Sequence, residues 1–204
     1  MKIKTLVVAL ALGAAACGSD GEPAPVEPVA SIPSLSGQDT AVTLDAGFVE
    51  ALGALELTPA PLGDAELSGG VASFPITGGT VTYYKPGTES PYVQGMIAHD
   101  GSGLSLAGAG KTVELTDFAV DPGKSVLTGK VAVDGEVAAE SAPLFFLDGR
   151  TLKPLRTGDG TAVLEGTTVK LKQEAADLLN QTFGTDALAG GFVVGVAKIT
   201  VNTA

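Results

Sequence analysis

One histidine and three tyrosines are the side chains of this sequence best suited to hold a ligand. His99 is the only histidine, and it shares an alternating phase with Val93 and Ile97, so we expect it on the inward face of a strand. An imidazole in that position can contact a metal. The alternative is a structural histidine at a strand end before Asp100-Gly101, hydrogen-bonded to a carbonyl of the turn. Both interpretations stay open.

Three tyrosines, Tyr83, Tyr84 and Tyr92, come shortly before His99 in the sequence. A tyrosine phenolate can ligate ferric iron. A tyrosine in a sheet can also simply pack, with its hydroxyl at the surface. The candidate ligand-binding residues are therefore His99 and these three tyrosines.

The single cysteine, Cys17, follows a segment typical of export signals. Lys2 and Lys4 precede a short apolar run over residues 6–12 and a set of small residues that ends at Ala16. The arrangement resembles the lipobox of bacterial lipoproteins, although Ala14 stands where leucine is commonest. We expect a signal peptide over residues 1–16 and a lipid anchor on Cys17, hence an extracytoplasmic protein held to a bacterial membrane. The alternative is an ordinary secretory signal.

No motif of an enzyme or of a metal site is recognisable. Four aspartates stand beside glycines in turn-like positions, and the Asp-x-Asp-x-Asp pattern of a calcium loop is missing. No Gly-x-Ser-x-Gly precedes a helix, and no phosphate-binding loop is present. The sequence therefore predicts no catalytic residues, no metal site and no enzymatic activity. The aspartates are Asp100, Asp134, Asp148 and Asp159.

The charge of the chain argues against a nucleic-acid partner. It has 12 basic and 23 acidic residues, and loss of Lys2 and Lys4 with a signal peptide leaves 10 basic residues and a net charge of −13. Such a surface repels polyanions.

The order of apolar and turn residues predicts one mainly β domain. Residues 17–37 would be the lipidated cysteine and a flexible proline-rich tether, and residues 38–204 a single domain. Within it we expect an antiparallel sandwich or barrel with two helices, over residues 46–55 and 173–183. Strands 92–99 and 104–106 would flank a turn, and Asp134-Gly135 would form a hairpin.

The strand around residue 116 changes phase. Val113 and Leu115 share one phase, whereas Phe118 and Val120 share the other. A bulge near Thr116-Asp117 would bring all four side chains to one face.

Short glycine, histidine and leucine patterns from about Leu44 onward resemble the HtaA domain of secreted bacterial haem-uptake proteins. That resemblance implies the HtaA fold and haem as a candidate ligand of His99, Tyr83, Tyr84 and Tyr92. The tryptophan-containing opening strand and haem-ligating tyrosine usual in the family have no counterpart here. The matching segments are Phe74-Pro75, Gly78-Gly79, Gly95, residues 97–101, residues 104–106, residues 147–149, residues 169–171, residues 174–176, Phe183 and Gly195.

Two functions from different classes follow. One is a non-enzymatic lipoprotein that binds a ligand, with haem as a candidate. The other is a structural or adhesive envelope lipoprotein that recognises a protein or polysaccharide through its sheet face.

Overall fold

The structure, a computed structural model, describes residues 25–203, so Cys17 and the expected signal peptide lie outside the described residues. The elements are β1 (Ala30–Ile32), β2 (Gln38–Leu44), α1 (Ala46–Ala54), β3 (Thr58–Gly63), β4 (Glu66–Ser68), β5 (Val71–Pro75), β6 (Gly78–Tyr83), β7 (Val93–Gly108), β8 (Lys111–Asp121), β9 (Val126–Val133), β10 (Glu136–Asp148), the 3₁₀ helix η1 (Gly149–Thr151), β11 (Arg156–Gly158), β12 (Thr161–Leu171), α2 (Gln173–Phe183) and β13 (Val193–Asn202).

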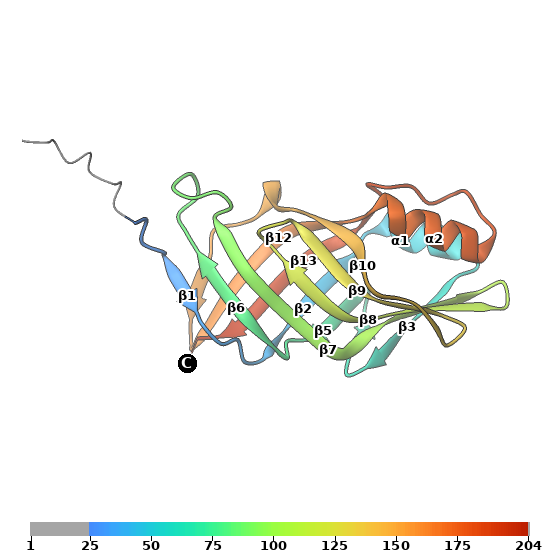
Figure 1. The fold of residues 1–204 in the computed structure, drawn as a ribbon, viewed down its shortest axis with the longest axis horizontal. Helices are drawn as coiled ribbons and strands as arrows, with labels where there is room; N and C mark the ends of the chain where they lie inside the picture. Colours follow the sequence, from blue (N-terminus) through green and yellow to red (C-terminus); the bar gives the residue numbers. More distant parts are fainter. Residues whose placement is uncertain (1–24, 204) are drawn as a thin grey trace, which may run out of the picture.

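All thirteen strands belong to one antiparallel sheet that curls around an interior (Figure 1). The main order is β1-β6-β7-β8-β9-β10-β12-β13-β2-β5-β4, with β11 beside β12 and β3 beside β7. Helices α1 and α2 lie together at one end of the molecule (Figure 1). The predicted class, an antiparallel sandwich or barrel with two helices, is confirmed.

Paired bulges bend β7 and β8 at the same level of the sheet. The register between them shifts between His99 and Gly103, and β8 shifts against β9 between Thr116 and Ala119. The predicted bulge near Thr116-Asp117 is therefore confirmed. The predicted turn after His99 is wrong, because β7 runs unbroken through residues 100–103 and stays paired with β8 beyond them. An extra residue in the bulge switches which side chains face inward.

Both predicted helices are present. Asp45 caps α1 by accepting a hydrogen bond from the Gly47 N–H at 2.9 Å, and Phe48 is buried beneath the helix. Val49, the next residue, is exposed. Helix α2 ends at Gly184, whose left-handed conformation closes the last turn.

The expected tether is partly built into the sheet. β1 pairs with β6, and Leu35 is buried with its N–H bonded to the Gly79 carbonyl at 2.9 Å. Residues 29–37 therefore belong to the folded domain, whose described part begins before Gln38. The composition of this segment does not predict its order, because the segment is held by a strand of only three residues and one buried leucine.

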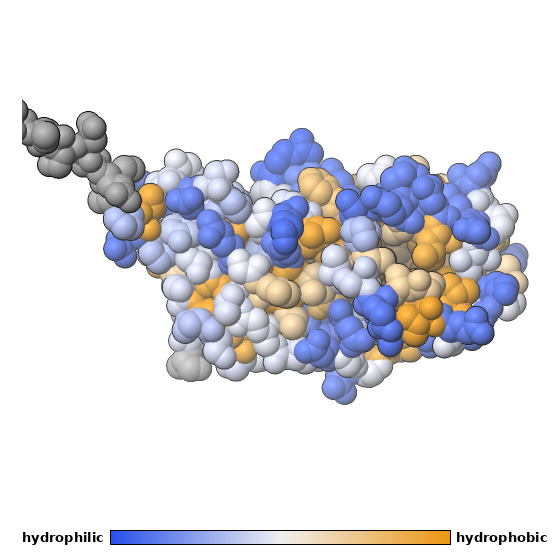
Figure 2. Space-filling model, viewed as in Figure 1, coloured by the Kyte–Doolittle hydropathy of each residue, from blue (hydrophilic) through white to orange (hydrophobic). Residues whose placement is uncertain are grey.

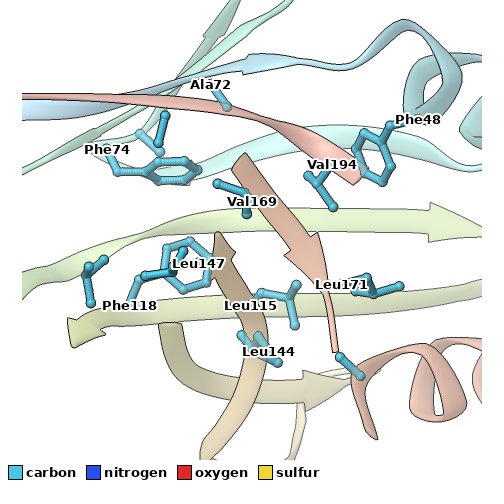
Figure 3. Packing of buried hydrophobic residues seen from close by; sticks show 14 of the residues in the cluster. Phe48, Ala72, Phe74, Leu115, Phe118, Leu144, Leu147, Val169, Leu171 and Val194 are labelled. Carbon is cyan, nitrogen blue, oxygen red and sulfur yellow. The ribbon is translucent and has the colours of Figure 1, made fainter. Parts of the chain in front are cut away.

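The core lies inside the curl and consists of aliphatic and aromatic side chains (Figure 3). Phe74 and Phe118 meet edge to face at a centroid distance of 5.2 Å. Gly129 makes room for this pair, since a Cβ there would lie 2.8 Å from the Phe118 ring and 2.9 Å from Leu144. The glycine thus has a packing role in β9.

The outer surface is largely hydrophilic on the face shown, with small separate apolar patches (Figure 2). Met96 and Phe146 are among the exposed apolar side chains. Among residues 25–203, neither helix has the length and apolar character needed to cross a membrane.

Candidate functional site

His99 is buried, and both of its ring nitrogens have partners. Nδ1 lies 2.9 Å from the Pro75 carbonyl oxygen, which can only accept, so Nδ1 carries the proton and donates it. Nε2 lies 3.2 Å from the Thr40 hydroxyl, which then donates to it. The ring is 1% exposed and packs edge-on against Phe74 at 6.4 Å. The imidazole is thus fully satisfied within the protein.

These contacts join strands from opposite ends of the sheet. His99 is in β7, near one end of the strand order, whereas Thr40 and Pro75 are in β2 and β5, near the other. Beside them the Thr77 N–H donates to the Ala98 carbonyl at 2.9 Å, and the Asp100 N–H donates to the Thr77 hydroxyl at 3.0 Å. We call this set of contacts the closing seam, because it holds the curled sheet shut.

Burial keeps the seam histidine neutral. Loss of hydration lowers the pKa of His99, while hydrogen bonds to the Pro75 and Phe74 carbonyls and the charges of Asp100 and Asp39 oppose that shift more weakly. The net direction is a pKa below the ordinary 6.5. The neutral ring suits the observed pattern of one donating and one accepting nitrogen.

An apolar cavity of about 430 Å³ runs inside the curl. Its walls come from nearly every large strand and from both helices, and its lining on β7 extends from Val93 past His99 to Leu106. Because this lining follows one strand over most of its length, we call the cavity the channel. Within the described residues, Glu174 on α2 is the only Asp, Glu, Lys or Arg that lines it.

Tyr83 and Tyr92 lie at one end of this channel, which we call the mouth. Both line the cavity, and their rings meet edge to face at 6.0 Å. Burial, and secondarily the neighbouring Tyr83, raises the pKa of Tyr92, so its hydroxyl stays protonated near neutral pH. Tyr84 is half-buried and does not line the cavity.

The structure does not bring the tyrosines to His99. Tyr83 pairs with Val93, which is six residues from His99 along β7, or about 20 Å. His99 and Tyr83 therefore line the same channel at different levels. A single small ligand group cannot touch both.

An outer hollow adjoins the mouth and carries charge. It shares Tyr92, Ser125, Leu147, Gly149 and Leu152 with the channel lining. It also contains two charged residues from the end of β10 and from η1, which are Asp148 and Arg150.

Asp148 is held by two cations. Arg150 Nε donates to Oδ1 at 2.9 Å, Arg150 Nη2 donates to Oδ2, and Lys170 Nζ donates to Oδ2 at 2.8 Å. Arg150 and then Lys170 keep the pKa of this carboxyl well below its usual range. The side chain of Arg150 is 82% exposed, while that of Asp148 is 8% exposed. The cluster thus has one carboxylate for two cations.

These residues fit haem only in part. A haem iron needs an axial ligand, and His99 has no nitrogen free for one in this arrangement. Tyr83 and Tyr92 stand at the mouth with phenol oxygens that could ligate iron. The donor set predicted from the sequence, His99 together with tyrosines, is not assembled at one point.

Sequence reasoning missed most of the site. The roles of Thr40 and Pro75 could not be predicted, although Phe74-Pro75 is among the HtaA-like segments, because these roles depend on how the two ends of the sheet meet. The ion pairs of Arg150 and Lys170 could not be predicted, because the sequence pattern assigns their common partner, Asp148, to a turn beside Gly149. The phase change between His99 and Leu104 was a usable signal, since it matches the one that predicted the bulge in β8.

The fold is similar to that of a bacterial HtaA domain. No protein-family model matches the chain, and no curated protein matches it. Among solved structures, the C-terminal domain of HtaA from Corynebacterium glutamicum matches with a TM-score of 0.57 at 13% identity, covering 84% of this chain and 98% of that one.

A histidine-to-alanine variant of the same HtaA domain, a domain-swapped dimer, matches with a TM-score of 0.51 at 15% identity. That match covers 78% of this chain and 92% of the other. The resemblance to the HtaA domain found in the sequence is therefore confirmed at the level of the fold.

The closing seam predicts acid-sensitive stability. Because the unfolded histidine takes up a proton near pH 6.5 and the native one resists it, stability should fall as pH drops below 6.5, by at most about 1.4 kcal/mol per pH unit. Urea unfolding from pH 7.5 to 5.5 measures this. His99→Gln should lack that slope, since no other histidine exists.

Thr40→Val is the matched control for this titration. It should cost about 1–3 kcal/mol at neutral pH by leaving Nε2 unpartnered, yet retain an acid slope because the imidazole still titrates. Superimposable pH profiles for the wild type and His99→Gln would contradict the seam as described.

Proposed function

We propose that this protein binds an elongated apolar molecule in the channel inside its curled sheet, as a non-enzymatic binding protein. The observation that supports this most is the cavity of about 430 Å³, with a volume in the range of ligand sites and walls that are almost entirely apolar. Apolar walls favour an apolar occupant, because water inside would find few hydrogen-bond partners.

The wall next to the mouth offers a way to test the channel. In β1, Ala30 and Ile32 line the cavity, whereas Ser31 between them is exposed on the other face. β1 is an edge strand, so a large residue there can be accommodated with little strain. Ala30 and Ser31 thus form a matched pair for inward and outward substitution.

Nile red, a neutral dye that brightens in apolar surroundings, reports on the channel. Wild-type protein should bind it with saturable, one-to-one stoichiometry. Ala30→Trp should weaken binding about tenfold or more by filling the channel, while Ser31→Trp should leave affinity within about twofold. Absence of saturable binding, or equal losses in both variants, would overturn the proposal.

Haem binding at the mouth is the second candidate. The fold similarity and the edge-to-face pair of Tyr83 and Tyr92 at the entrance favour it. Hemin should then give a shifted Soret band that is lost in the Tyr83→Phe and Tyr92→Phe double variant but kept in Tyr84→Phe, which lies off the channel. A spectrum that the double variant leaves unchanged would exclude these tyrosines, and His99→Ala tests the remaining candidate.

For its location, we propose that the protein works outside the cytoplasm, anchored to a bacterial membrane through lipid on Cys17. The supporting features are the lysines, apolar run and small residues before this single cysteine. Intact-mass analysis of the purified native protein should give a chain that starts at a diacylglyceryl-modified Cys17. An unmodified N-terminus, or cleavage elsewhere, would refute the anchor.

The adhesive alternative would be favoured by a long unpaired edge strand. The strands that end the main order, β1 and β4, have three residues each, but residues 136–142 of β10 pair on one side only, with β9. The apolar cavity beside His99 favours a ligand inside the sheet over a partner on its face.

A further inference from the structure

We infer that Arg150 binds the anionic head group of an amphiphile whose apolar chain occupies the channel, so that the ligand class is a long-chain carboxylate. This inference rests on the proposed function, because it assigns the polar end of the same ligand. It is carried by the outer hollow at the mouth, where a cationic cluster adjoins the apolar entrance.

The guanidinium of Arg150 has donors left for a ligand. Its Nε and Nη2 are bonded to the Asp148 carboxylate, whereas no hydrogen bond within residues 25–203 uses Nη1. Arginine carries five N–H donors in a planar fork, and the Nη1 pair suits a carboxylate. Asp148 holds the Arg150 guanidinium in place. The cluster nevertheless keeps a net positive charge, because Lys170 also bonds to Asp148.

The two ends of the channel carry charges of opposite sign. At the outer hollow, Arg150 shares the Asp148 carboxylate with Lys170, which leaves one net positive charge on this cluster in a chain of formal charge −11. At the other end, Glu174 of α2 is the only charged residue in the lining among the described residues. An anionic group is therefore favoured at the mouth and disfavoured at the α2 end.

The shape of the site agrees with an acyl chain. The channel is lined by apolar side chains along β7 from Val93 to Leu106, which suits a flexible apolar chain. Burying an ionised carboxylate without a partner costs much free energy. The head group of the ligand must therefore remain near water while its acyl chain enters the channel. Arg150 is exposed enough to meet it there.

Equilibrium dialysis with tritiated palmitate and tritiated hexadecanol distinguishes the contribution of the head group to binding from that of the acyl chain. Wild-type protein should bind both and prefer palmitate. Arg150→Gln should weaken palmitate binding about tenfold and leave hexadecanol binding unchanged, since only the carboxylate uses the guanidinium. Arg156→Gln is the matched control, because Arg156 is an exposed, ion-paired arginine outside both cavities.

The outcomes distinguish the head-group inference from the proposed binding in the channel. Equal palmitate affinity in the wild type and Arg150→Gln, or equal losses for both ligands, would overturn the head-group inference while the channel remains a binding site. Failure of the wild type to bind either ligand or Nile red would overturn the proposed function itself. Urea unfolding of each variant verifies that it is folded.

Discussion

The structure depends on a buried imidazole that joins the two ends of one sheet. An open curled sheet would leave its concave, apolar face in contact with water. The hydrogen bonds of His99 to Pro75 and Thr40 hold β7 against β2 and β5, and those of Thr77 join the β5–β6 connection to β7. Because the seam is satisfied on both sides of the ring, a polar group can sit in the core without an unpaired donor or acceptor. The enclosed channel is a consequence of this closure.

The channel also depends on the small size of many inward-facing residues. Aromatic residues make up 5% of the chain, and alanines occupy lining positions on several strands and on α2. Larger side chains at these positions would fill the space, as Phe74 and Phe118 do at the centre of the core. The strand ladders and the seam keep the walls apart, so the space persists as a possible ligand site. The small inward-facing residues and the closure of the sheet thus together create the space that a ligand could occupy. The alanines that line the channel are Ala30, Ala72, Ala142, Ala162, Ala175 and Ala197.

Much of the fold could be predicted from local patterns, whereas the site could not. The phase change around Thr116-Asp117 located a bulge, and the apolar stripe of residues 173–183 located a helix, because each is set by residues close in sequence. The inward direction of His99 was also visible from its neighbours. Its partners lie 24 and 59 residues away, and the distance from Tyr83 to His99 depends on strand register. Such relations follow from how the sheet curls, which no single segment encodes.

The central claim, that neutral His99 closes the sheet as a donor at Nδ1 and an acceptor at Nε2, can be measured directly. A long-range ¹H–¹⁵N correlation spectrum of the ¹⁵N-labelled protein contains signals from one imidazole only. At pH 7 it should show a protonated Nδ1 and an unprotonated Nε2, because burial lowers the pKa of the ring from its ordinary 6.5. A proton on Nε2 with a bare Nδ1, or a doubly protonated ring at pH 7, would contradict this account of the closing seam.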